Sequence, residues 1–247
     1  MSTTVGKALK VLELLSTYGQ PVRLAELSRD LAMNKSTTYR LLEKMSQLGY
    51  VRQAPTDSRY MLTTRMWAIG VRAFRNFDIR AWAKRHLEEL ESELHETAVL
   101  AVLEGDDVVV VDKVASAQAV QTLSPLGSRS PMHCSSLGKA LLMGDPAGLM
   151  PRLKRLRKFT DKTITTLPAL REEIARATAA GVAEAYDEYR VGVSGVSAPI
   201  LGVDGVLLGV IGVSIPTMRA EGKHLEAIKA AVGLHAQKLS QALAGGN

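Results

Sequence analysis

The chain has 247 residues, of which 46% are hydrophobic, so it is long enough for two folded domains and too apolar to be disordered. Its 31 Lys and Arg residues exceed its 25 Asp and Glu residues and give a formal net charge of +6 at pH 7. The single cysteine, Cys134, excludes an internal disulfide and a multi-cysteine zinc site, and the five histidines lack ligand spacing, so no metal or cofactor is expected. The longest apolar run, residues 206–213, is too short to cross a membrane and no export signal is recognisable, which predicts a cytoplasmic protein.

Three amphipathic stretches near the N-terminus predict three helices. Apolar residues recur at helical spacing around residues 8–15, in a short segment at 24–31, and at 35–48. Because only three residues separate the second and third stretches, they indicate a helix-turn-helix. The buried stripe of the third helix is expected to consist of Leu41, Leu42, Met45 and Leu48.

The first turns of the third helix combine hydroxyl and cationic side chains. Asn34 or Ser36 is expected to cap this helix, and Gly49 to end it. Short hydroxyls can approach phosphates or base edges closely, and Arg40 has the planar guanidinium that suits guanine or phosphate. Contacts with double-stranded DNA are therefore predicted for Lys35, Ser36, Thr37, Thr38, Tyr39 and Arg40.

Two short strands are predicted after the third helix, at residues 50–53 and 59–62. The turn between them contains Pro, Thr, Asp and Ser, which is typical of a hairpin tip. Three helices followed by a hairpin form a winged helix-turn-helix, which we assign to residues 1–62. Arg52 and Arg59 of this wing are predicted to touch the DNA backbone or the minor groove.

The excess positive charge lies at the N-terminus. Residues 1–75 hold 12 Lys and Arg and 5 Asp and Glu, a net charge of +7, whereas the remaining 19 and 20 give −1. A helix-turn-helix can also serve only as a structural or dimerisation module, but such a module does not need this asymmetry. The charge distribution favours attraction to phosphate, and hence DNA reading.

Residues 63–77 are predicted to form a linker helix. Met66, Trp67 and Ile69 recur at helical intervals and would leave an apolar side exposed. The same helix of a second subunit is the simplest cover for it, which predicts a homo-oligomer built on a dimer of this chain. A two-fold dimer would place two reading helices in successive major grooves of a near-palindromic operator.

Residues 78–247 are predicted to form a second, α+β domain in which helices flank an antiparallel sheet. Residues 105–107 and 202–205 have the composition of hairpin turns. The expected helices span residues 79–95, 136–143, 168–180 and 222–243, and the expected strands span residues 98–103, 108–114, 196–201 and 206–215.

The chain resembles the isocitrate lyase regulator (IclR) family of bacterial transcription regulators over nearly its full length. The resemblance lies in four groups of motifs, whose order and spacing together are specific. They are MNKSTTYRLLEKMSQLGYV (33–51) with DSRYML (57–62), PLGSRSPMHCSSLGKALL (125–142), FTDKTITT (159–166), and DEYRVGVSGVSAPI (187–200) with SIPTMR (214–219).

This resemblance implies a winged helix, a dimerising linker helix and a C-terminal domain similar to GAF and PAS-type sensors. It implies a homo-oligomer that is either a dimer or a dimer of dimers. It also implies a ligand-responsive regulator, typically of a catabolic or transport operon, whose effector is a small organic or aromatic acid. Carried over to this sequence, the family's effector pocket corresponds to Ala119, Thr122, Ser130, Ser136, Leu137, Ala185, Val193, Gly195, Gly212 and Ser214.

Three of these positions depart from the pattern of members that bind small oxo-acids. Those members tend to have an acidic residue where Ala185 stands, a cysteine at Gly195 and a serine at Gly212. Small residues in place of polar ones imply more room and fewer hydrogen-bond donors, and so a larger or more apolar acid, aromatic ones included. A pocket filled by its neighbours is the alternative.

Two alternatives to a ligand-responsive regulator stay open. One is a constitutive DNA-binding protein whose second domain only oligomerises. The other is an enzyme that uses His133, Cys134 or Ser135, which the sequence disfavours because adjacent residues point in different directions. Gly138 and Lys139 resemble the end of a phosphate-binding loop, but the first glycine and the final Ser or Thr of that motif are missing, so nucleotide binding is not expected.

Overall fold

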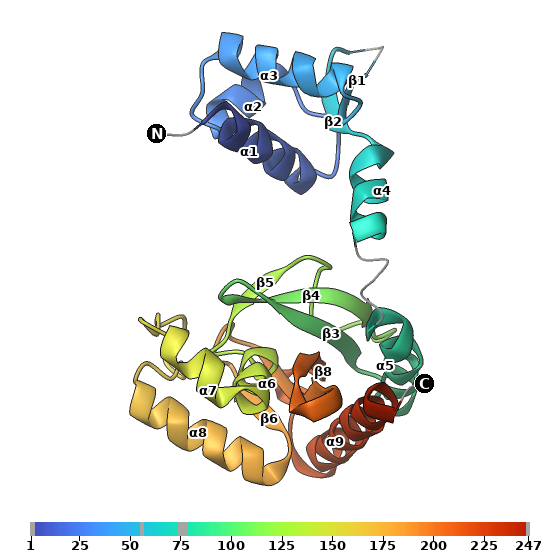
Figure 1. Cartoon of the computed structure of the whole chain (residues 1–247), viewed down its shortest axis with the longest axis vertical. Coiled ribbons are helices and arrows are strands. Elements are labelled where there is room, and N and C mark those ends of the chain that lie inside the picture. The colour runs from blue at the N-terminus through green and yellow to red at the C-terminus, as the bar shows by residue number, and fades with distance from the viewer. Residues whose placement is uncertain (1–2, 55–56, 74–78, 246–247) are drawn as a thin grey trace. The chain divides into compact units, whose positions relative to one another are not determined.

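A computed structural model describes residues 3–54, 57–73 and 79–245 of the chain. The chain divides into two compact units, Met1–Phe77 and Asp78–Asn247 (Figure 1). The tip of the predicted wing at residues 55–56 and the end of the predicted linker helix at 74–77 lie outside the described residues. No helix in the described ranges combines the length and the apolar character needed to cross a bilayer.

The first unit is a winged helix-turn-helix followed by one further helix. Its core joins apolar side chains of all three N-terminal helices to Val51 and Tyr60 of the wing. The two wing strands are antiparallel, with Arg52 opposite Met61. The elements are α1 (Thr4–Thr17), α2 (Leu24–Asp30), α3 (Lys35–Gln47), β1 (Val51–Gln53), β2 (Tyr60–Leu62) and α4 (Thr64–Ala73).

The end of α3 differs from the prediction in one residue. Leu41, Leu42 and Met45 are buried as expected, but Leu48 is 59% exposed. The helix ends at Gln47, and Gly49 adopts a φ of +76°, which a residue without a Cβ adopts at little cost. Leu48 therefore caps the helix end and does not continue the buried stripe.

The second unit is a six-stranded antiparallel sheet flanked by helices, which confirms the predicted α+β class. Its strand order is β5-β4-β3-β8-β7-β6. The strands are β3 (Thr97–Glu104), β4 (Asp107–Val114), β5 (Arg129–Pro131), β6 (Ala183–Tyr186), β7 (Val193–Leu201) and β8 (Leu207–Pro216). The helices are α5 (Ile79–Leu94), α6 (Ser136–Gly144), α7 (Pro146–Leu149), α8 (Leu167–Ala180) and α9 (Gly222–Gly245), with short 3-10 turns at Met150–Arg152, Val203–Gly205 and Thr217–Arg219.

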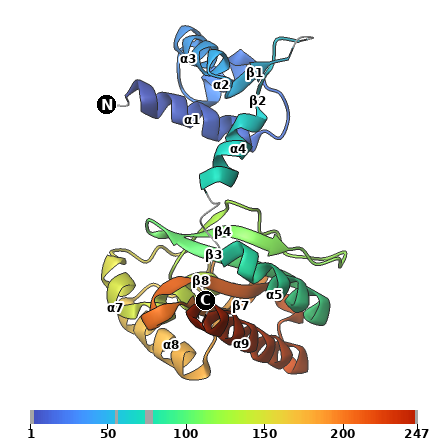
Figure 2. The same ribbon diagram turned by 45° about the vertical axis from the view of Figure 1, so that its right-hand side comes forward.

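The two faces of the sheet carry different side chains. On one face lie α5 and α9 (Figures 1 and 2). They cover β-branched and other apolar residues of β3, β7 and β8, such as Val196 and Ile211. On the other face, α6 and α8 cover a second apolar cluster that includes Ala101 and Val210. Because side chains alternate along a strand, the residues between those of the first cluster face α6.

Two strands and one helix were not predicted. β5 has three residues and ends at Pro131, and β6 has four residues at the edge of the sheet. Segments this short show no clear alternation in the sequence. They complete the sheet at both edges, and β5 and β6 lead directly into the loops around the cavity described below.

Candidate functional site

The exposed face of α3 carries a cluster of polar and cationic side chains. Lys35, Ser36, Tyr39 and Arg40 are exposed. The second pair follows the first by about one helical turn, so the four side chains share one side of the helix. Asn34 caps the helix, since its Oδ1 accepts a hydrogen bond from the Thr37 backbone N–H at 2.8 Å. The first turn is therefore fixed in orientation, and its side chains are free to meet a partner.

Thr38 does not belong to this exposed cluster. Its side chain is buried at 0% exposure, and its hydroxyl donates a hydrogen bond to the Asn34 carbonyl at 3.1 Å. The predicted DNA contact by Thr38 is therefore wrong, because the side chain lies under the helix with Leu41 and Leu42. The run of hydroxyl residues concealed this, since it spans more than one face of the helix.

The wing places its two arginines differently. Arg52 is exposed on β1. Arg59 lies just before β2, and its Nε is 3.0 Å from Asp57 Oδ2. Part of the charge of Arg59 is thus compensated by its own hairpin, whereas Arg52 presents its charge to solvent.

A cavity in the second unit brings together most of the predicted effector residues. It lies between the α6-facing side of the sheet and the start of α6, with walls from the loops before β5 and after β6. Eight of the ten predicted residues line it: Ser130, Ser136, Leu137, Ala185, Val193, Gly195, Gly212 and Ser214.

The other two predicted residues, Ala119 and Thr122, do not line this cavity. Both lie in the loop between β4 and β5, where Ala119 is exposed and Thr122 is buried. The Thr122 hydroxyl finds no hydrogen-bond partner among the described residues. Neither side chain therefore belongs to the wall of this cavity.

Strands β7 and β8 form the floor of the cavity with alternating glycines and serines. Gly195 pairs with Ser214, and Gly212 pairs with Ser197. A Cβ at Gly212 would overlap the Ser197 hydroxyl and the Val196 carbonyl. The expectation that these glycines enlarge the pocket is therefore wrong, since neighbouring serine side chains occupy the space.

The start of α6 adds backbone donors to the cavity wall. The Ser135 hydroxyl caps the helix by accepting from the Gly138 N–H at 3.1 Å. Ser136 and Leu137, both lining residues, keep first-turn N–H groups that have no intrahelical acceptor. The Ser136 hydroxyl accepts a hydrogen bond from Ser197 at 2.9 Å and is thereby oriented.

A carboxylate and a cation on the cavity wall were not predicted. Glu188 is 8% exposed, and its Oε2 has no hydrogen-bond partner among the described residues. Burial raises the pKa of Glu188, while Lys139 opposes that shift. Arg190 lies with its guanidinium 5.3 Å from the centre of the Tyr189 ring. The motif DEYR contained these residues, but their position on a cavity wall depends on the loop that follows β6.

Lys139 is a structural residue and does not resemble a phosphate-binding lysine. It is fully buried, and its Nζ donates to Glu188 at 2.5 Å, to Glu173 at 3.0 Å and to the Glu184 carbonyl at 2.9 Å. These three acceptors fill its hydrogen-bonding capacity. The resemblance to a phosphate-binding loop is thus explained by an internal ion-pair network.

The residues of the enzyme alternative do not form a nucleophile–base pair. The Nε2 of His133 is 2.9 Å from the Arg157 carbonyl, and the Ser135 hydroxyl donates to the Pro131 carbonyl. Cys134 is fully buried, and burial raises the pKa of its thiol to about 12. His133 is thus engaged away from both candidate nucleophiles.

The two sites together define a class of protein. One chain contains a winged helix-turn-helix with an exposed cationic helix and an α+β unit with a cavity whose floor is polar; this combination defines a DNA-binding protein with a sensor domain. Residues 4–55 match the IclR helix-turn-helix domain, and residues 71–241 match the C-terminal domain of bacterial IclR transcriptional regulators. The chain belongs to the IclR family, which confirms the prediction of a ligand-responsive DNA-binding transcription regulator.

Relatives support this assignment along the whole chain. The transcriptional regulator BhcR of Paracoccus denitrificans is 34% identical over 96% of this chain and 86% of its own length. The crystal structure of the Thermotoga maritima IclR has a TM-score of 0.83 and 25% identity, and the match covers 97% of this chain and 98% of that one. An IclR homologue of Microbacterium hydrocarbonoxydans, solved as a complex with 4-hydroxybenzoate, shares the fold at a TM-score of 0.81 and 24% identity over 97% of this chain and all of its own.

Proposed function

We propose that the cavity of the second unit binds an organic acid that also carries a hydroxyl group, and that this acid controls operator binding by the first unit. The observation that carries this proposal is that two sets of groups with opposite chemistry line the cavity. The first set offers positive charge and backbone N–H groups, and the second is a buried carboxylate oxygen without a donor.

The carboxylate of the effector fits the first set. The uncapped N–H groups of Ser136 and Leu137 lie at the positive end of the α6 dipole, which favours anions. Arg190 lines the same cavity and pairs with no carboxylate in the described part of the chain. Arg129 is less available, because its guanidinium already lies 2.7 Å from Glu104.

The hydroxyl of the effector fits the second set. Glu188 Oε2 is a buried acceptor, and a buried acceptor without a donor costs about 1–3 kcal/mol. A ligand hydroxyl would satisfy it once a rotation of the Glu188 side chain turns Oε2 toward the cavity, whereas a methyl or a ring hydrogen would not. The lining also has apolar members, which favour a ring or short chain over a fully polar sugar: Val99, Val110, Leu123 and Val213.

We further propose that operator DNA is read by the exposed residues of α3, with support from the wing. Lys35, Ser36, Tyr39 and Arg40 supply the contacts of the reading helix, and Arg52 those of the wing. Thr37 is half-buried and serves mainly the helix cap. The cationic excess of residues 1–75 supplies the attraction to phosphate that does not depend on sequence.

The regulator is proposed to act as a dimer through α4. Trp67 is 71% exposed and Ile69 is 42% exposed on this helix of the isolated chain. Two such helices packed together would bury these side chains and set the spacing of two reading heads. Sedimentation of Trp67→Glu should then show a weaker dimer than the unmodified chain, and equal dimerisation would contradict the role of α4.

The effector class is tested by a thermal-shift panel built from matched compounds. We expect 4-hydroxybenzoate to stabilise the second unit more than benzoate, which lacks the hydroxyl, or 4-hydroxybenzamide, which lacks the charge. A ligand at about 100 times its Kd adds roughly 2.7 kcal/mol to stability, so a weak binder is also visible. Equal shifts for all three compounds would contradict the two-part recognition, and no shift with any aliphatic or aromatic acid would favour the constitutive regulator.

A further inference from the structure

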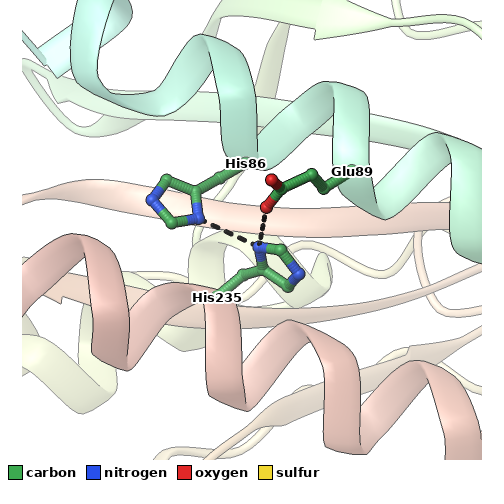
Figure 3. Close-up of side chains that lie close together, drawn as sticks. All are labelled: His86, Glu89 and His235. Atoms are coloured by element: carbon green, nitrogen blue, oxygen red, sulfur yellow. Dashed lines mark hydrogen bonds and ion pairs between the residues drawn. The ribbon is translucent and has the colours of Figure 1, made fainter.

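Three potential metal ligands meet on the side of the sheet opposite the cavity. His86 and Glu89 lie on α5, and His235 lies on α9, which packs beside it (Figure 3). The Nδ1 atoms of the two histidines are 2.9 Å apart, and Glu89 Oε2 is 3.8 Å from His235 Nδ1. All three ligand atoms lie within 4.8 Å of one another.

The packing of α5 against α9 fixes this arrangement. Ala83, Leu87 and Leu90 of α5 and Val232, Ala236 and Leu239 of α9 belong to one buried cluster. His86 and Glu89 are three positions apart on α5, so they lie on the same side of the helix, at the edge of this cluster. His235 is 5% exposed and faces them across the helix pair. The ligands are therefore held by rigid elements.

The hydrogen bonds of the cluster leave ligand atoms available to an ion. The Nδ1 atoms of His86 and His235 face each other at 2.9 Å, and a metal ion would replace the proton of this hydrogen bond. Arg85 binds Oε1 of Glu89, at 2.7 Å from its Nε, which leaves Oε2 turned toward His235.

The surrounding charges include both signs. Arg85 and Lys238 oppose a cation here, whereas Glu89 and the nearby Glu93 favour one. The Arg85 side chain is 84% exposed, so solvent screens its charge. Hence the local charge does not exclude a divalent ion. Which ion is preferred depends on the ligand types, two imidazoles and one carboxylate.

We propose that His86, Glu89 and His235 form a binding site for Zn²⁺ or a similar first-row divalent ion. Two imidazoles and one carboxylate suit this class of ion, whereas Mg²⁺ and Ca²⁺ prefer oxygen ligands. With Zn–N bonds of about 2.1 Å in a tetrahedral site, the two Nδ1 atoms would lie about 3.4 Å apart, so small side-chain rotations from 2.9 Å suffice. The exposed rim at Glu89 leaves the fourth position to water.

Such an ion would join the first and last helices of the second unit. Residues 74–78 connect α4 to α5, so α5 is the first described element of this unit after the reading unit. A metal bond between α5 and α9 would oppose their separation and stabilise this unit independently of the acid cavity. The site is thus a structural or metal-sensing element that the family assignment does not include.

The test is a zinc titration of the full chain, purified without a polyhistidine tag, in competition with a coloured zinc chelator. We expect one equivalent of Zn²⁺ per chain, and an affinity at least about ten-fold lower in His86→Gln and His235→Gln. His224→Gln and Glu88→Gln serve as matched controls, because His224 lies beside Glu96 and Glu88 lies on α5 outside the cluster. Both controls should bind Zn²⁺ like the unmodified chain.

Melting curves separate metal binding from folding. The melting temperature of the unmodified chain should rise with Zn²⁺ and should not rise with Mg²⁺. His86→Gln should show no rise with Zn²⁺, and without metal it should still melt cooperatively. His86 is only partly buried, so this variant decides the test even if His235→Gln does not fold. Absence of saturable Zn²⁺ binding, or binding that both histidine variants retain, would overturn the proposal and leave a simple hydrogen bond between the two histidines.

Discussion

The two units of this regulator use charge in opposite ways. In the first unit, Lys35, Arg40 and Arg52 are exposed and have no ion-pair partner among the described residues. In the second unit, Lys139 is buried between two carboxylates, and Arg219 binds the buried Glu96 through both Nε and Nη2, at 2.6 and 2.7 Å. Charge that is left free can attract a phosphate backbone, whereas charge that is paired inside the unit holds its elements together and, at Glu188, fixes part of the cavity wall.

This contrast predicts different consequences for the loss of a cation in each unit. The largest effect is expected for Lys139→Met, which would leave Glu173 and Glu188 close together in a buried site. Breaking a buried ion pair on one side costs about 3–5 kcal/mol. Denaturation by urea, followed by circular dichroism, measures the loss. Lys154→Met, an exposed position, is the control and should be close to neutral; a stable Lys139→Met variant would contradict the structural role of this lysine.

The floor of the cavity gives the second largest effect. Gly212→Ala would place a methyl group against the Ser197 hydroxyl, and overpacking of this kind costs about 1–3 kcal/mol. The variant should also bind acids more weakly, because Ser197 must move. Gly233→Ala on α9 is the matched control, since its Cβ would meet only Val182 at 3.5 Å and alanine favours helix. If Gly212→Ala were as stable as Gly233→Ala, the close approach of the Ser197 side chain to Gly212 described above would be wrong.

In the reading unit, a lost cation should change DNA binding and leave folding intact. Arg40→Ala should weaken operator binding by about 1–3 kcal/mol if Arg40 reads a base, and should weaken all sequences alike if it holds a phosphate. Fluorescence anisotropy with an operator selected from random duplexes, and with a scrambled duplex, separates these outcomes. Lys10→Ala, which removes an exposed cation on α1, controls for net charge. If both variants lowered the operator affinity by the same small factor, the proposed DNA-reading role of α3 would be contradicted.

The smallest effect concerns the thiol of the cavity wall. Burial raises the pKa of Cys134 to about 12, so at pH 8 only about one thiol in ten thousand is ionised. Native protein should therefore react with a disulfide reagent far more slowly than protein unfolded in guanidinium. Labelling at the unfolded rate in native protein would show that Cys134 is accessible and reactive, and would revive the enzyme alternative.

The helices of the reading unit could be predicted from the sequence almost completely, because the spacing of apolar residues along a helix shows which side chains are buried and which are exposed. The stripe of Leu41, Leu42 and Met45 assigned the buried side of α3, and Gly49 assigned its end. The errors are local. The run of hydroxyl residues predicts Thr38 on the DNA side, but it lies three positions before Leu41, on the buried side. The apolar spacing also predicts that Leu48 is buried, but the helix ends one residue before it.

The cavity could be predicted only in part, because it depends on strand pairing. Gly195 and Gly212 were assigned to it by the family resemblance, but their effect was misjudged, since the serines that fill the space belong to the partner strand and to α6. Because side chains alternate along a strand, Ser197, two positions after Gly195, lies on the same side of β7. This alternation was enough to predict Ser197 as a cavity residue. The histidine cluster had no sequence signal, because His86 and His235 are 149 residues apart.

The central claim is that one acid, bound in the cavity, changes the affinity for DNA. The most direct measurement is the Kd of the selected operator with and without a saturating acid from the panel, together with the Kd of that acid with and without operator. We expect both dissociation constants to change by the same factor, about 5- to 150-fold, because coupling between two binding sites is reciprocal. An acid that stabilises the second unit but leaves the operator Kd unchanged would contradict the account.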